Sequence, residues 1–136
     1  MTLDSHGKTI LVVDDNPLNI KLAVSVLEAE GFSAASAASA EEALVAIETR
    51  MPQLVLMDIG LRGMDGLTLT RHLRSNTRHA GLRIIAFTAL AMKGDDQRAL
   101  EAGCDGYISK PIDTRTFARQ VAAYLPDRDA TRRGAT

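Results

Sequence analysis

Short apolar runs alternate along this chain with amphipathic stretches of helical period, and that alternation restricts the fold more than any other feature. Residues 9–13, 54–57, 84–87 and 107–108 are expected to form buried strands, and residues 32–36 a weaker one. Continuous apolar runs are typical of parallel strands that are covered on both faces. The pattern therefore predicts an α/β fold, a doubly wound parallel sheet with helices on both faces.

Local signals mark the ends of several expected helices. Asn16 followed by Pro17 is a favourable N-cap and first-turn pair, and Gly31 is a natural end for the same helix. Asp113 is expected to cap the last helix. That helix has an apolar stripe at a spacing of four, made of Phe117, Val121 and Leu125.

Length, charge and cysteine content exclude several classes of protein. A chain of 136 residues is expected to form one domain, here over residues 8–125, between polar tails at 1–7 and 126–136 of which the second is expected to be disordered. A net charge of -1 argues against binding of nucleic acid, and no apolar run reaches the about 20 residues that span a membrane. The first seven residues do not resemble a signal peptide, and Cys104 is the single cysteine, so we expect a cytoplasmic protein without internal disulfides.

Four polar motifs follow directly after apolar runs. They are Asp14–Asp15, Asp58, Thr88–Ala89 and Lys110–Pro111. The carboxyl ends of parallel strands meet at one edge of the sheet, where ligands bind in this class of fold. We therefore expect three carboxylates, a hydroxyl group and an ammonium group to converge there.

Such a set of groups suits a divalent cation and a phosphoryl group. Crowded carboxylates repel one another, and Mg²⁺, a hard cation that prefers oxygen ligands, would relieve that repulsion. The carboxylate of Asp58 can act as a nucleophile toward phosphorus. The ammonium of Lys110 and the hydroxyl of Thr88 can bind phosphoryl oxygens, while the small Ala89 leaves room for the group.

The same residues resemble a known family, the response-regulator receiver domains (CheY-like) of two-component signalling. The resemblance rests on ILVVDDNPLN, LVLMDIGLRGMDG, IIAFTALAMKGDD and GCDGYISKPI, and covers nearly the whole chain. The residues of these stretches are most similar to those of single-domain regulators of the DivK type or of receivers fused to hybrid sensor kinases. The resemblance implies a five-stranded sheet with strand order 2-1-3-4-5.

The resemblance also implies a role for each matching residue. Asp58 matches the phosphoacceptor, and the implied ligands of Mg²⁺ (or Mn²⁺) are Asp14, Asp15, Asp58 and the backbone carbonyl of Gly60. The implied phosphoryl-binding residues are Thr88, Ala89 and Lys110. Thr88 and Tyr107 match a pair of switch residues, and the bond between Lys110 and Pro111 is a candidate cis peptide.

The implied function is that of a stand-alone receiver domain, a signalling phosphoacceptor rather than an enzyme. A sensor histidine kinase or histidine phosphotransfer protein would donate the phosphoryl group, and a downstream protein would read the change or receive the group. A homodimer is possible, through the fourth and fifth helices or through the first, and the sequence does not decide between them.

Two alternatives and two departures from the family pattern remain. A receiver fold that binds partners without phosphorylation is the first alternative. A Mg²⁺-dependent phosphatase is the second, and Gly60 argues against it because a second acid/base carboxylate would be needed there. Arg62 replaces a proline that is common in the family. Gly60 and Leu90 cannot hold an attacking water through their side chains, which predicts an acyl phosphate that is not unusually short-lived.

Overall fold

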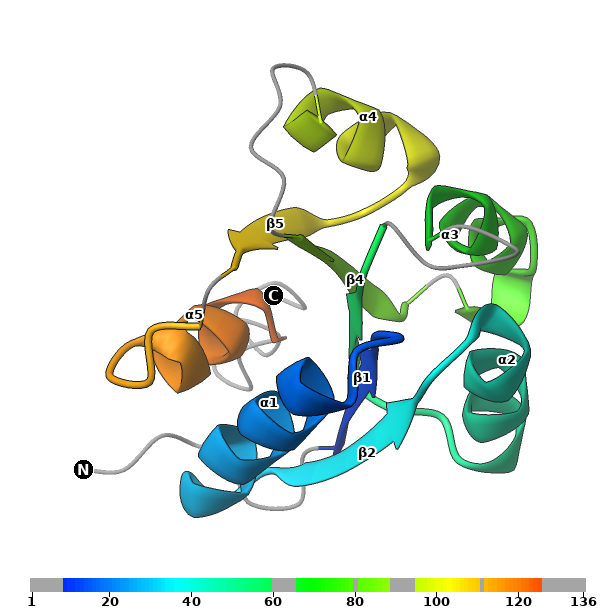
Figure 1. The fold of residues 1–136 in the computed structure, drawn as a ribbon. Coiled ribbons are helices and arrows are strands. Elements are labelled where there is room, and N and C mark those ends of the chain that lie inside the picture. Colours follow the sequence, from blue (N-terminus) through cyan, green and yellow to red (C-terminus); the bar gives the residue numbers. More distant parts are fainter. Residues whose placement is uncertain (1–8, 60–65, 80, 89–94, 111, 126–136) are drawn as a thin grey trace, which may run out of the picture.

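A computed structural model describes residues 9–59, 66–79, 81–88, 95–110 and 112–125 (Figure 1). Its five parallel strands form one sheet in the order β2-β1-β3-β4-β5, which confirms the predicted fold class and strand order. The strands are β1 (Thr9–Val13), β2 (Ser33–Ala37), β3 (Leu54–Met57), β4 (Arg83–Thr88) and β5 (Gly106–Ser109). The helices are α1 (Pro17–Ala29), α2 (Ala40–Thr49), α3 (Gly66–Arg74), α4 (Asp95–Ala102) and α5 (Phe117–Tyr124), with a 3-10 turn at Thr77–His79.

Helices cover both faces of the sheet, with α1 and α5 on one face and α2, α3 and α4 on the other (Figure 1). Alternate residues of each strand pack into two separate cores, so that Val12 of β1 faces α1 and α5 while Leu11 and Val13 face the opposite layer. All five residues of β1 and all four of β3 are buried, as the continuous apolar runs predict. Within the described part of the chain, no helix has the length and apolar character needed to cross a bilayer.

The residues predicted to mark the ends of helices do so in the structure, except at the start of α5. The Asn16 side chain accepts a hydrogen bond from the Leu18 amide at 2.9 Å, and Gly31 has a φ of 92° after the end of α1. The prediction that Asp113 caps the last helix is wrong, since α5 begins at Phe117. Asp113 instead shapes the preceding turn, where its carboxylate accepts the Arg115 amide at 3.0 Å. That hydrogen bond, followed by the contact with the Arg115 side chain, lowers the pKa of Asp113.

Candidate functional site

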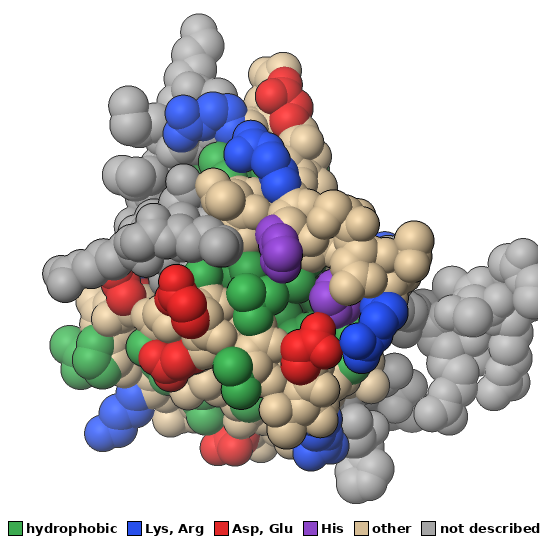
Figure 2. Space-filling view, turned by 90° about the vertical axis from the view of Figure 1, so that its right-hand side faces the viewer, with side chains coloured by type: hydrophobic (Ala, Val, Ile, Leu, Met, Phe, Trp, Pro, Cys, Tyr) green, Lys and Arg blue, Asp and Glu red, His purple; other side chains and the backbone are tan. Residues whose placement is uncertain are grey.

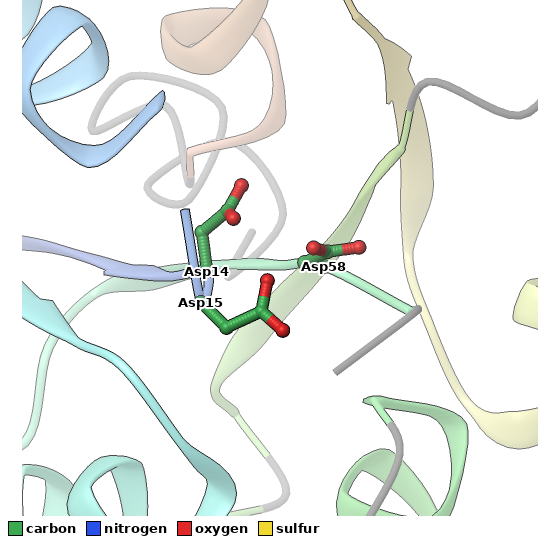
Figure 3. Close-up of side chains that lie close together, drawn as sticks. All are labelled: Asp14, Asp15 and Asp58. Atoms are coloured by element: carbon green, nitrogen blue, oxygen red, sulfur yellow. The ribbon is translucent and has the colours of Figure 1, made fainter. Parts of the chain in front are cut away.

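Three carboxylates lie together at the carboxyl edge of the sheet. Asp14 and Asp15 follow β1 directly, and Asp58 follows β3. Strand pairing fixes two of their backbones, because the Asp14 amide donates to the Ala37 carbonyl at 3.1 Å and the Asp58 amide donates to the Val13 carbonyl at 2.9 Å. The three side chains point toward a common space (Figure 3), and one oxygen atom from each lies within 4.8 Å of the others.

The carboxylate of Asp14 is fully buried, and its charge is compensated inside the protein. One oxygen accepts the Asn16 amide at 2.8 Å, and the other accepts the Lys110 ammonium at 2.6 Å. The same Nζ atom lies 3.5 Å from Oδ2 of Asp58. A buried carboxylate is tolerated only when it is paired and hydrogen-bonded, so these contacts explain how Asp14 remains inside the fold.

Lys110 is held at the site by packing as well as by charge. Its side chain is 12% exposed, and Nζ lies 5.0 Å from the centroid of the Phe87 ring, within the range of a cation–π contact. The Phe87 ring in turn packs against Phe117 of α5, with centroids 5.7 Å apart. Phe87 was not among the predicted site residues, although its place just before Thr88 in an apolar run was the available signal.

Gly66 was also missed, and it controls how closely α3 approaches the site. A Cβ atom at this position would overlap the Asp58 carbonyl oxygen and lie 2.7 Å from the Cα atom of Ile59. The first residue of α3 therefore packs directly on the backbone that carries Asp58. Gly66 lies in a glycine-rich stretch of the sequence, but its spacing alone does not reveal this contact.

The other residues of the predicted site are only partly described. Thr88 ends β4, with its backbone opposite Ser109 of β5, and its side chain lies outside the described atoms. Tyr107 of β5 is half-buried and packs on the core beneath α3 and α4. Several sequence-based expectations fall outside the described residues: those on Gly60, Arg62, Ala89, Leu90 and Pro111.

The chemistry of the donor set fits a divalent metal ion. Carboxylate oxygens are the ligands that Mg²⁺ prefers, and the Asp14, Asp15 and Asp58 oxygens are close enough to share one ion. The Lys110 ammonium supplies one positive charge against these three carboxylates, which leaves an excess of negative charge for a cation to neutralise. A partly buried cluster of this kind binds Mg²⁺ more readily than separate carboxylates on the surface.

A single family accounts for this fold and this cluster. Residues 10–122 match the response regulator receiver domain, and the chain therefore belongs to that family. A protein of this family is a component of two-component signalling, as the resemblance implied.

Individual relatives agree with this assignment. The chain is 40% identical over 120 residues to the polar-differentiation response regulator DivK of Brucella ovis, covering 88% of this chain and 98% of that protein. A CheY-like response regulator receiver domain protein from Methanospirillum hungatei has 33% identity and a TM-score of 0.77, covering 85% and 91% of the two chains. The chemotaxis protein CheY4 of Vibrio cholerae, at 20% identity and a TM-score of 0.82 over 87% and 98%, supports the fold alone.

Proposed function

We propose that Asp58 accepts a phosphoryl group from a phosphohistidine of a sensor histidine kinase or histidine phosphotransfer protein, in a reaction that requires Mg²⁺. The observation that carries this proposal is the convergence of Asp58 with two further carboxylates and the Lys110 ammonium at one edge of the sheet. Membership of the receiver family supports the same assignment. We infer that the reaction takes place in the cytoplasm, where such donors present their phosphohistidine.

The covalent step is a transfer from nitrogen to oxygen. A carboxylate oxygen of Asp58 forms a bond to phosphorus as the bond between phosphorus and the donor imidazole breaks, and the released imidazole takes a proton from solvent. Transfer of this kind depends mainly on in-line positioning and on charge stabilisation. The amide hydrogen bond from Asp58 to Val13 and the close packing of Gly66 hold the nucleophile in place.

Charge stabilisation comes from the residues around Asp58. Asp14, Asp15, Asp58 and the Gly60 carbonyl would hold Mg²⁺, which when bound neutralises the oxygens of the transferred group. The Lys110 ammonium donates a hydrogen bond to Asp14 and lies 3.5 Å from Asp58, so a small movement would bring it to a phosphoryl oxygen. The hydroxyl of Thr88 and the small side chain of Ala89 would complete the binding of the phosphoryl group.

The proposed output is a shape change in the face formed by α4, β5 and α5. Thr88 would move toward the new oxygens, and Tyr107 would turn into the space beside it. The backbone amide and carbonyl of Tyr107 lie 3.5 and 3.4 Å from the Tyr124 hydroxyl, which links this strand to the end of α5. A downstream protein that binds the altered surface more tightly would be selected by phosphorylation.

Phosphoramidate, a small donor that also carries a nitrogen–phosphorus bond, tests this proposal. Intact-mass spectrometry should show one added phosphoryl group in wild type with Mg²⁺, and none after chelation or in Asp58→Asn. Asp113→Asn, which changes an exposed aspartate outside the cluster, should react like wild type. Incorporation into Asp58→Asn at the wild-type level would refute the proposal, as would incorporation that is independent of divalent metal.

A further inference from the structure

The two edges of the sheet are protected differently. At the β5 edge, the Tyr124 hydroxyl donates to the Tyr107 carbonyl at 3.4 Å and faces the Tyr107 amide at 3.5 Å. The Tyr124 ring also lies so close to Gly106 that a Cβ atom there would overlap it. A side chain of α5 therefore covers the outward backbone groups of β5, as expected for an edge that must not pair with another chain.

Among the residues that the structure describes, none covers the β2 edge in this way. The Asp14 amide donates to the Ala37 carbonyl, and Ala37 is in register with Val13, so Ala37 bonds to β1. Because bonding alternates along a parallel ladder, Ala34 and Ser36 direct their amides and carbonyls away from the sheet. No described residue outside the ladder hydrogen-bonds to these groups. The strand, SAASA, also lacks the charges and prolines that usually block edge pairing.

We propose that β2 pairs antiparallel with β2 of a second copy of this chain, about a two-fold axis through Ala35. In this register Ala34 of one copy lies opposite Ser36 of the other, and each such pair exchanges two backbone hydrogen bonds. Ala35 lies opposite itself in a non-hydrogen-bonded pair, in which Cα atoms approach to about 4.5 Å. The exposed side chains of Ala35 and its neighbours are small enough for this approach.

The surface beside β2 is self-complementary in charge under the same rotation. A hollow of about 430 Å³ flanks the start of the strand and is bordered by Arg50, and a second of about 400 Å³ flanks its end and is bordered by Glu41 and Glu42. The two-fold axis reverses the strand direction, so Arg50 of each copy faces the acidic end of the other. Val45, which is 67% exposed, borders the second hollow beside the two glutamates. The face that carries α2 shows apolar side chains among acidic ones (Figure 2).

These features favour a second copy over an unrelated strand. An unrelated peptide could pair with the open backbone groups of Ala34 and Ser36. Nothing requires such a peptide to place an acidic group opposite Arg50 and a basic group opposite Glu41 and Glu42, whereas a second copy does so by symmetry. The resulting dimer would contain one continuous ten-stranded sheet with the two Asp58 sites at opposite ends. The α4, β5 and α5 surfaces would remain free in both copies.

A disulfide test reports the register directly. Ala35→Cys places two thiols opposite each other within the Cα separation of about 4.4–6.8 Å that a disulfide requires, and mild oxidation should give a covalent dimer. Ser33→Cys is the matched control, because its copies would lie about 13 Å apart along the strands. The native Cys104 is buried, and wild type should stay uncrosslinked. Absence of a covalent dimer in Ala35→Cys, or an equal yield in Ser33→Cys, would overturn the proposal.

Sedimentation velocity over a range of concentrations gives a second test that needs no oxidation. Wild type should dimerise reversibly, Ala35→Lys should weaken the dimer about tenfold or more because two like charges would face each other, and Ala123→Lys on exposed α5 should not. Arg50→Glu should weaken the dimer, and adding Glu41→Arg and Glu42→Arg should restore it. A wild type that stays monomeric, or a dimer lost in Ala123→Lys and kept in Ala35→Lys, would contradict pairing through β2.

Discussion

A bound cation and a phosphoryl group would both interact with the groups that surround Lys110. Its Nζ atom lies 2.6 Å from Asp14 and 3.5 Å from Asp58, two of the expected ligands of Mg²⁺. In the proposed reaction, Lys110 would compensate the carboxylates before the metal binds and would stabilise the phosphoryl group afterwards. Removing its charge should separate these two roles.

Lys110→Met should bind Mg²⁺ about tenfold more tightly than wild type, because the variant lacks the ammonium charge that repels the ion at close range. The same variant should retain less of the phosphorylation-induced change, since the phosphoryl oxygens lose their ammonium partner. Isothermal titration calorimetry measures the affinity. Lys21→Met, which removes an exposed lysine of α1, is the control. Weaker Mg²⁺ binding in Lys110→Met than in wild type would contradict this prediction.

Gly66 gives a second test at the residue scale. Gly66→Ala should lower the free energy of unfolding by about 1–3 kcal/mol, the usual cost of overpacking, because the new Cβ overlaps the Asp58 carbonyl. It should also slow phosphorylation by displacing Asp58. Gly81→Ala is the matched control, since a Cβ there meets no atom within 4 Å. Chemical denaturation measures the effect, and equal stability of the two variants would show that α3 does not constrain the site.

The thiol of Cys104 links stability to pH. Burial raises the pKa of Cys104, and the Thr70 hydroxyl 3.9 Å away offsets this only in part. A pKa raised on folding contributes stability that is present below the ordinary value of 9.0 and lost as the pH rises through the folded value. The free energy of unfolding of wild type should therefore fall more steeply above that pH than that of Cys104→Ala. Parallel curves from denaturant titrations would contradict this assignment.

At the scale of secondary-structure elements, one side chain of α3 connects several others. The guanidinium of Arg74 donates to the carbonyls of His79, Leu82 and Gly103 and to the carboxylate of Asp105, at 2.6 to 3.1 Å. The same Asp105 oxygen accepts the Ile84 amide at 2.9 Å. Arg74 therefore fixes the end of α4 and the starts of β4 and β5 relative to α3.

Arg74→Met should destabilise the protein by about 2 kcal/mol, because it leaves partly buried carbonyls without donors while keeping the apolar stem. Faster amide hydrogen exchange at Ile84 would be the local sign of this loss. The control is Arg71→Met on the exposed side of the same helix, which should leave both quantities unchanged. If Arg74→Met unfolds at the same denaturant concentration as Arg71→Met, the contacts of Arg74 are not needed to hold these elements together.

The sequence predicts the limits of a helix or strand well where a single local pattern determines them. The bounds of β1 and β3 agree with the prediction, since both strands are uninterrupted runs that local sequence alone delimits. The strand β2 begins one residue later than predicted because its small side chains carry no alternation, and only pairing with β1 sets its limits. Asp113 was misjudged as a cap because an aspartate can begin either a turn or a helix.

The site was predictable to the same degree and for the same reason. The carboxylates and Lys110 each follow an apolar run, and parallel strands bring such positions to one edge. Phe87, Gly66 and Arg74 act through contacts between segments far apart in sequence. Local patterns carry at most a weak signal of such contacts, so the folded structure is needed to identify these residues.

In the whole molecule, three edges of the sheet differ in the groups that lie on them. The carboxyl edge carries the cluster of Asp14, Asp15 and Asp58, the β5 edge is covered by α5, and no described residue covers the β2 edge. A phosphoryl group on Asp58 would act on the β5 side through Thr88 and Tyr107. Pairing through β2 would leave that side free, so both events could occur in the same molecule.

Chemical mapping of the acyl phosphate shows whether Asp58 itself carries the phosphoryl group. After phosphorylation with Mg²⁺, borohydride reduces an aspartyl phosphate to homoserine, which peptide mass spectrometry then locates. Homoserine is expected at position 58 alone, and at no position when Mg²⁺ is chelated during phosphorylation. Homoserine at position 14 or 15, or a phosphorylated protein with no homoserine at position 58, would contradict it.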